Sequence, residues 1–217
     1  MTSVPALPAA VLAGGRSSRL GPNKLVLHLR GTPLVGHAVR AVKEVRWVTN
    51  AYLVVSPGSV WDVTGLGADG ALVDEFMVGP PGAVLTALEV LDECVVVGGD
   101  MPLINPAVLE ALIRVCSEAC VGCAACVPRV GRFLEPLHAV YGQRLAPILR
   151  AALSCGHSSL QELLKLLVSE GVAVAVDVEA IASEAGLGLS HVLRSFTNIN
   201  TWGDLMAVAR GAWGSGV

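Results

Sequence analysis

The sequence predicts a single α/β domain built on a doubly wound, mostly parallel β-sheet. Short apolar segments alternate along the chain with longer segments of helical periodicity, as expected of repeated strand–helix units. Some short segments, such as Cys94 to Val97, are apolar at every position, which is typical of strands buried on both faces of a parallel sheet. Because the sequence contains no linker, repeat or low-complexity segment, we expect residues 1–217 to form one domain.

Each expected element follows from its local pattern. Short Ala-, Val- and Leu-rich runs predict strands at Ala9–Ala13, Ala51–Ser56, Ala71–Val73, Val95–Gly98, Ala124–Pro128 and Val172–Val176. Apolar residues spaced three and four apart predict helices at Pro33–Val45, Ala83–Leu91, Pro106–Cys120, Ala146–Leu153, Leu160–Val168 and Gly203–Ala209. Asn105 and Thr201 are candidate N-terminal caps. Since ligands bind at the carboxyl ends of strands in such sheets, the candidate binding loops follow the first four strands.

The composition excludes several classes of protein. Hydrophobic residues make up 53% of the chain and charged residues only 15%, so the chain is too apolar for intrinsic disorder. The net charge is -3 and the 15 basic residues form no run, which argues against a nucleic-acid partner. No apolar stretch reaches the roughly 18 residues of a membrane span. The apolar N-terminus lacks the basic residues of a secretory signal, so we expect a cytoplasmic protein.

Four of the six cysteines form the pattern C-x3-C-x2-C-x2-C. Such a cluster of thiols can hold zinc or an iron–sulfur centre. Alternatively, Cys116 and Cys120 would end an apolar helix. Cys123 and Cys126 would then lie on the following strand, as core residues or disulfide partners. The apolar surroundings favour this second interpretation, and the sequence leaves open whether the thiols are free, paired or metal-bound.

The loop after the first strand has the composition of a phosphate-binding loop. It reads L-A-G-G-R-S-S-R-L-G-P-N-K from Leu12 to Lys24. Its glycines allow backbone N–H groups to approach an anion closely, and its serines can donate hydrogen bonds. Arg16, Arg19 and Lys24 concentrate three of the chain's 15 basic residues here. This charge predicts a phosphate site rather than a solvated turn.

The loop after the central strand places one carboxylate directly beyond a buried segment. Asp100 follows Gly98-Gly99 in the string G-G-D-M-P. An Asp in this place could instead cap a helix, but Asn105 is the better cap for the helix that begins at Pro106. Asp100 is therefore predicted to hold Mg²⁺, or Mn²⁺, on bound phosphates.

Six segments then occur in an order that is typical of one enzyme family. They are L-A-G-G-R-S-S-R-L-G, L-R-G-T-P-L, G-D-M-P, E-P-L-H-A-V-Y, S-L-Q-E-L and F-T-N-I-N-T. Together they span about residues 8–206 and resemble the molybdenum cofactor guanylyltransferases, a family of MobA-like nucleotidyltransferases. The first segment is shared by many nucleotidyltransferases, whereas E-P-L-H-A-V-Y and F-T-N-I-N-T are more specific. The resemblance implies a Rossmann-like, GT-A-like fold with a nucleotide-binding half (about 8–105) and an acceptor-binding half (about 106–210).

The resemblance also implies roles for individual residues. Lys24 and Arg19 would act in catalysis by neutralising the triphosphate of GTP, and Asp100 would hold magnesium. Asp74 would bind guanine and so favour GTP over ATP. Further nucleotide contacts would come from Leu12, Ala13, Gly14, Gly15, Arg16, Ser17, Ser56 and Gly79, with Asn198 and Asn200 on the pterin side. Two positions depart from the family, since Ser56 replaces an Asn and Asn23 replaces the commoner Asp.

The implied reaction transfers GMP from GTP to the phosphate of molybdopterin and releases pyrophosphate. The attacking phosphate is already ionised near neutral pH, so no general base is required. His138 is therefore interpreted as a packing or hydrogen-bonding residue. The partners implied are GTP and molybdopterin, with transient contact to other cofactor-biosynthesis proteins or apo-molybdoenzymes.

Two alternatives stay open at this point. The chain could be a sister enzyme that uses CTP on molybdopterin, or GTP on another phosphorylated acceptor such as adenosylcobinamide phosphate. Met101 favours the guanylyl reaction, because the cytidylyl enzymes usually carry Gln there. The chain could also be a non-catalytic protein that delivers nucleotide or cofactor, but the presence of both Lys24 and Asp100 favours an enzyme.

Overall fold

The computed structural model describes residues 4–14 and 24–211. The strands are β1 (Leu7–Leu12), β2 (His28–Leu29), β3 (Thr32–Pro33), β4 (Val48–Val55), β5 (Gly70–Val73), β6 (Cys94–Gly98), β7 (Ala125–Val130), β8 (Phe133–Leu134), β9 (His138–Tyr141) and β10 (Ala173–Asp177). The helices are the 3-10 turn η1 (Lys24–Val26), α1 (Leu34–Lys43), α2 (Pro80–Leu91), α3 (Pro106–Ala119), α4 (Leu145–Ser154), α5 (Leu160–Ser169), α6 (Val178–Ala185), α7 (Leu189–Ser195) and α8 (Trp202–Ala209).

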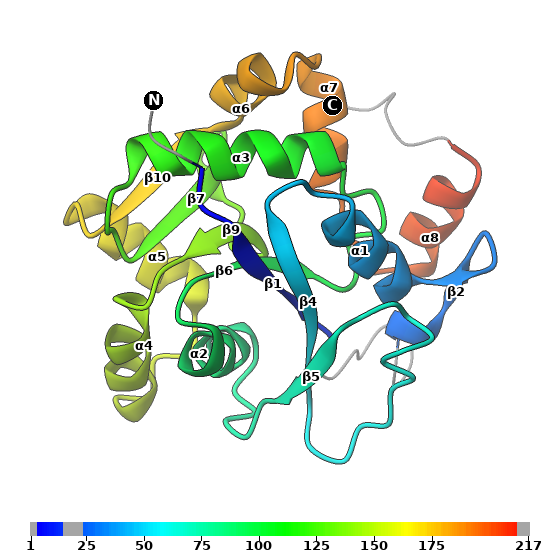
Figure 1. The fold of residues 1–217 in the computed structure, drawn as a ribbon, viewed down its shortest axis with the longest axis horizontal. Coiled ribbons are helices and arrows are strands. Elements are labelled where there is room, and N and C mark those ends of the chain that lie inside the picture. Colours follow the sequence, from blue (N-terminus) through cyan, green and yellow to red (C-terminus); the bar gives the residue numbers. More distant parts are fainter. Residues whose placement is uncertain (1–3, 15–23, 212–217) are drawn as a thin grey trace.

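One twisted sheet forms the centre of the molecule (Figure 1), with the strand order β10-β7-β9-β6-β1-β4-β5. β1 pairs in parallel with β4 and β6, β4 with β5, and β10 with β7. β9 lies antiparallel between β6 and β7, and β8 adds an antiparallel partner to β7. β2 and β3 form a separate two-stranded sheet. The sheet is thus mixed but mostly parallel.

Helices cover both faces of this sheet. α1, α3, α6 and α7 pack against one face, and α2, α4 and α5 pack against the other (Figure 1). The central strands are buried throughout, as in the five residues of β6, because both faces are covered. α8 packs instead with Leu29 and Leu34 in a small third cluster beside β2. The doubly wound α/β fold predicted from the alternating apolar segments is confirmed.

Local signals explain where several helices begin. Asn105 caps α3, since its side-chain oxygen accepts a hydrogen bond from the backbone N–H of Ala107 at 3.0 Å. Thr201 caps α8 in a reciprocal capping box with Asp204. Both caps were expected from the sequence. Every predicted strand and helix is present within a few residues of its expected bounds.

Some elements were not predicted. The short strands β2, β3 and β8, the antiparallel strand β9, and helices α6 and α7 were missed. The prediction that Cys123 lies on a strand is wrong, because β7 begins only at Ala125. The chain turns back after α3 at Gly122, whose φ of 71° favours glycine, and pairing with the strand region around Val172 starts at Ala124.

Candidate functional site

The predicted binding loops meet at the carboxyl edge of the parallel strands. Leu12 at the end of β1 lies in register with Gly98 of β6 and Val54 of β4. The backbone N–H of Gly99 donates to the carbonyl of Leu12 at 3.0 Å, and a Cβ on Gly99 would lie only 2.8 Å from that oxygen. Glycine is therefore required for the loop before Asp100 to pass this close to β1.

The loop after β1 also packs closely on the loop after β4. The backbone N–H of Ala13 donates to Val54 at 2.7 Å. A Cβ on Gly14 would lie 3.1 Å from the hydroxyl oxygen of Ser56. Leu12, Ala13, Gly14 and Ser56 thus lie together, and their contacts with a nucleotide stay predictions. Gly15, Arg16, Ser17 and Arg19 fall in residues 15–23, outside the described residues, so their predicted roles stay predictions.

Lys24 forms the centre of the charged part of the site. Its ammonium nitrogen lies 2.6 Å from a carboxylate oxygen of Asp100, and the two side chains are 16% and 17% exposed. The same ammonium donates to the carbonyl of Ile199 at 2.9 Å and to the side-chain oxygen of Asn200 at 2.9 Å. Residues from the middle and from the last part of the chain therefore surround the positive charge of Lys24.

The loop before α8 is fixed in place by its own hydrogen bonds. The backbone N–H of Ile199 donates to the carbonyl of Asp100 at 2.9 Å. A carboxylate oxygen of Asp204 accepts from the backbone N–H groups of Asn200, at 2.9 Å, and Thr201, at 2.7 Å. This geometry orients the Asn200 side chain toward Lys24.

The ionisation of Asp204 reflects these contacts. Partial burial disfavours the charged carboxylate, but the backbone N–H groups of Asn200 and Thr201, the Thr201 hydroxyl and nearby Lys24 together lower its pKa. The sequence analysis did not assign Asp204 or the Ile199 carbonyl to the site. The sequence signal for Asp204 was its position three residues after a capping Thr. The Ile199 carbonyl could not be predicted, because every residue has a backbone carbonyl.

Asp74 lies in the same edge of the sheet but serves its own loop. It is buried, and one of its carboxylate oxygens accepts from the backbone N–H groups of Phe76, at 3.1 Å, and Met77, at 3.3 Å. The hydroxyl of Thr86 on α2 donates to the same oxygen at 3.3 Å. Gly79, with a φ of 79°, follows as the residue before α2. Asp74 thus ties its loop to α2, and a direct contact with guanine stays a prediction.

The two asparagines predicted for the pterin side have different surroundings. Asn200 contacts Lys24, as described above. Asn198 is half-buried, and its amide donates to the carbonyl of Phe196 at 3.5 Å. The structure therefore brings Asn200, but not Asn198, into hydrogen-bond contact with the Lys24–Asp100 pair.

His138 is buried beneath this edge. Its ring lies 4.6 Å from that of Phe196, and neither ring nitrogen has a hydrogen-bond partner among the described residues. Complete burial lowers its pKa to about 3, because the charged imidazolium would lose its hydration. The imidazole is therefore neutral and packed, in agreement with the interpretation of His138 as a residue other than a general base.

The described residues contain no group of three or more His, Cys, Asp or Glu side chains arranged to hold a metal ion. Asp100 thus offers a single carboxylate. This suits Mg²⁺, which usually binds through one or two carboxylates and completes its coordination with phosphate oxygens and water.

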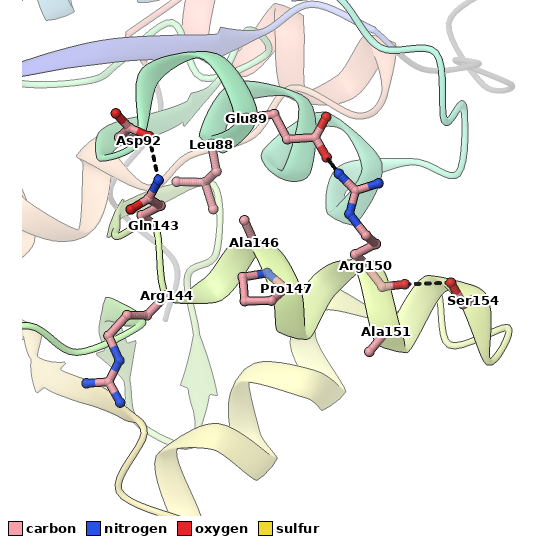
Figure 2. Close-up of a pocket in the computed structure, with 10 residues that line it drawn as sticks. All are labelled: Leu88, Glu89, Asp92, Gln143, Arg144, Ala146, Pro147, Arg150, Ala151 and Ser154. Carbon is pink, nitrogen blue, oxygen red and sulfur yellow. Dashed lines mark hydrogen bonds and ion pairs between the residues drawn. The ribbon is translucent and has the colours of Figure 1, made fainter.

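One cavity in the described part of the chain lies away from this edge. It has a volume of about 730 Å³ and lies between α2 and α4 (Figure 2). An ion pair between Glu89 and Arg150 and a hydrogen bond from Gln143 to Asp92 cross it. Its cations are thus partly neutralised, and neither Lys24 nor Asp100 lines it.

No helix in the described ranges has the length and apolarity to cross a membrane.

Comparisons with known proteins agree with this geometry. Residues 9–174 match the family described as "MobA-like NTP transferase domain". The chain is 32% identical over 203 residues to a "Probable molybdenum cofactor guanylyltransferase" of Thermococcus gammatolerans, covering 93% of this chain and 98% of the relative. A relative of the same name from Pyrococcus furiosus is 38% identical over 148 residues, which is 68% of this chain and 74% of the relative.

A solved structure shares the whole fold. It is the crystal structure of molybdopterin-guanine dinucleotide biosynthesis protein A from Archaeoglobus fulgidus, with a TM-score of 0.73 and 27% sequence identity over 95% of this chain and 98% of that chain. The family match, the relatives and the charged site at the carboxyl edge lead to one conclusion: this chain is a member of the MobA-like NTP transferase family.

Proposed function

We propose that the protein transfers the guanylyl group of GTP to the phosphate of molybdopterin, giving molybdopterin guanine dinucleotide and pyrophosphate. The observation that carries the proposal is the contact of Lys24 with Asp100 and Asn200, next to the close-packed loop from Leu12 to Gly14. The names of the relatives support the choice of GTP and of the molybdenum cofactor. We also propose the division into a nucleotide-binding half (about 8–105) and an acceptor-binding half (about 106–210), although Asn200 of the second half reaches Lys24 of the first.

The proposed reaction is an in-line displacement. An ionised oxygen of the molybdopterin phosphate forms a bond to the α-phosphorus of GTP, while the bond from that phosphorus to the bridging oxygen of the β-phosphate breaks. The bonding electrons leave with pyrophosphate, so the protein needs no general base. Positioning and stabilisation of negative charge provide most of the rate.

Lys24 has the central role in this mechanism. Its ammonium is paired with Asp100 at 2.6 Å. When a triphosphate binds, Lys24 exchanges part of this contact for phosphate oxygens, and Asn200 and the Ile199 carbonyl keep the ammonium at the edge of the sheet. Arg16 and Arg19 would add positive charge to the same triphosphate.

Asp100 would be the residue that holds Mg²⁺. A bound Mg²⁺ would supply positive charge to the triphosphate and to the leaving pyrophosphate. When the Lys24 ammonium pairs with the phosphates instead, the Asp100 carboxylate becomes available for this ion. The two residues are thus expected to change partners together.

The nucleotide and the acceptor are tested in one experiment. Pyrophosphate release is measured with GTP, CTP or ATP, each with molybdopterin, with adenosylcobinamide phosphate or with no acceptor, and in the presence or absence of Mg²⁺ or Mn²⁺. We expect release only with GTP, molybdopterin and metal together. Release with CTP and molybdopterin would identify a cytidylyl enzyme. Release with GTP and adenosylcobinamide phosphate alone would identify another acceptor, and binding without release would identify a delivery protein.

The proposed reaction also has consequences for the cell. GTP is a cytoplasmic metabolite, so we place the enzyme in the cytoplasm. Its product is a cofactor, so we propose transient contact with other cofactor-biosynthesis proteins or apo-molybdoenzymes. Copurification of a molybdoenzyme precursor with the product-loaded protein is the corresponding test.

A further inference from the structure

Four cysteines gather in one segment at the amino-terminal edge of the sheet, opposite the candidate site. Cys116 and Cys126 are joined by a disulfide, with Cα atoms 5.8 Å apart. Cys120 and Cys123 are joined by a second disulfide, with Cα atoms 5.5 Å apart. The inner pair, separated by two residues, lies within the segment closed by the outer pair.

The two disulfides differ in their access to solvent. Cys116 and Cys126 are 4% and 1% exposed, because they lie between α3 and β7 in the core of one face. Cys120 and Cys123 are only half-buried. They flank a turn whose outer residue, Val121, is 88% exposed. The inner disulfide is therefore more accessible to a reagent in solution than the outer one.

A cavity and a cation lie beside the turn that carries the inner pair. A cavity of about 330 Å³ is lined by all four cysteines and opens beside the turn. Arg144 donates from its guanidinium to the carbonyl of Gly122, between the two cysteines, at 2.5 Å. The positive charge of Arg144 is thus held at the turn that carries the inner pair, and it would favour the ionised form of a thiol that came close to it.

We propose that Cys120–Cys123 is a thiol–disulfide exchange site, and that Cys116–Cys126 is a structural cross-link shielded from exchange. The partner is a dithiol. One of its thiolates attacks a sulfur of the inner pair, the protein S–S bond breaks, and a mixed disulfide forms. The second thiolate of the dithiol then displaces the protein sulfur. The protein gains two electrons and two protons as a pair of thiols, and the dithiol is oxidised to its disulfide.

The outer cross-link separates this exchange from the candidate site. It ties the end of α3 to β7, and β7 pairs with β9, which in turn pairs with β6. β6 ends at Gly98, two positions before Asp100. Since the outer bond maintains this chain of contacts, reduction of the inner bond is expected to leave nucleotide transfer within about twofold of its initial rate.

The first test is a titration of the native, full-length protein with dithiothreitol, followed by alkylation and mass spectrometry of each cysteine. Cys120 and Cys123 are expected to become alkylated together, at a dithiothreitol concentration about tenfold lower than Cys116 and Cys126 require. Exposed Cys155 should react without reductant and serves as an internal control. Alkylation of all four cysteines without reductant, or at one common concentration, would overturn the proposal.

Two double variants form a matched pair for the second test. Cys120→Ser with Cys123→Ser should remove the low-concentration step and lower the melting temperature by only a few degrees, while the outer bond persists. Cys116→Ser with Cys126→Ser should lower it more, by roughly 5–10 °C, because that bond closes the longer loop. Equal shifts for both pairs would contradict the assignment of the structural role to the outer bond.

A metal site is the competing use of these residues, and the same protein tests it. The fully reduced protein is incubated with zinc and dialysed, and the retained zinc is counted. We expect less than one zinc per ten chains. Retention of one zinc per chain, with protection of all four cysteines from alkylation, would overturn the exchange proposal in favour of a thiolate metal site.

Discussion

The two edges of the sheet hold reactive side chains in different ways. At the carboxyl edge, Lys24 is 76 positions from Asp100 and 176 positions from Asn200, and only hydrogen bonds and an ion pair join them. At the amino edge, the cysteines of each pair are ten and three positions apart and are joined by covalent bonds. The first edge can exchange its partners when a ligand binds, whereas the second cannot rearrange without chemistry.

This difference follows from what each edge must do. A site for a polyphosphate needs positive charge that is held in position but can be given up to the ligand, and a partly exposed ion pair meets both needs. At the amino edge, the outer disulfide has only to hold the end of α3 against β7. The contrast predicts that substitutions at the carboxyl edge change activity more than stability, and that the reverse holds elsewhere.

The largest effect on activity is expected from Asp100→Asn. The substitution removes the single carboxylate proposed to hold Mg²⁺, so transfer should fall by about 10³-fold or more, while the melting temperature changes by a few degrees at most. Pyrophosphate release and thermal unfolding measure the two effects. Asp69→Asn is the matched control, because Asp69 also pairs with a lysine, Lys43, but on the surface. Wild-type turnover in the Asp100 variant would refute the proposed function.

Lys24→Met should reduce transfer by about 10²–10³-fold, because the side chain keeps its length but loses the charge directed at the triphosphate. Steady-state kinetics with varied GTP should show the loss mainly in kcat, since the charge is needed most as pyrophosphate leaves. Lys43→Met removes a surface ion pair instead and should leave kcat unchanged. Equal losses in the two variants would show that the effect is not specific to the site.

Asp204→Asn should have an intermediate effect on activity. Asp204 would influence the reaction only by positioning Asn200 and Lys24. A weaker acceptor for the backbone N–H groups of Asn200 and Thr201 would loosen the loop, with about a tenfold loss of kcat and a loss of about 1 kcal/mol in stability. Asp177→Asn, which breaks an exposed pair with Arg129, is the control. If Asp204→Asn lowers stability but not kcat, Asp204 serves only the capping box of α8.

The smallest effect on activity is expected at His138, where stability should change with pH. The folded state binds the proton only near pH 3, whereas the unfolded state binds it near pH 6.5. The contribution of neutral His138 to the free energy of unfolding is therefore fully present above about pH 6.5. It is lost as the pH falls toward 3, by up to about 1.4 kcal/mol per pH unit. His138→Leu should flatten this decline in denaturant unfolding between pH 7.5 and 5. Identical pH profiles for the two proteins would contradict the assignment.

Much of the fold could be read from local patterns. Fully apolar runs such as Cys94 to Val97 have few alternatives to a buried strand, and Asn105 before Pro106 predicts a helix start by itself. The antiparallel strand β9 was missed because its four residues follow a proline-containing segment that shows no turn signal specific to a hairpin. Its place between β6 and β7 depends on pairing with distant segments, which no local pattern records.

The site could be predicted in part for the same reason. Lys24 and Asp100 stand out because charged residues are rare in this chain and both follow expected strands. The Ile199 carbonyl and the role of Asp204 were not predicted, because they depend on where the last loop folds back onto the first. The burial of Asp74 against Thr86 was likewise hidden, since it depends on how α2 packs beside β5.

By itself, the sequence determined which residues are apolar, where helices can start, and which few residues carry charge or sulfur. Those are properties of single residues and their near neighbours, and they suffice for the α/β class and for the candidate residues. Only the tertiary structure decided that Lys24 meets Asp100 and Asn200, and which cysteines pair, since four cysteines allow three pairings. Contacts between distant segments depend on how the whole chain packs, because each of these contacts requires that the other segments are also in place.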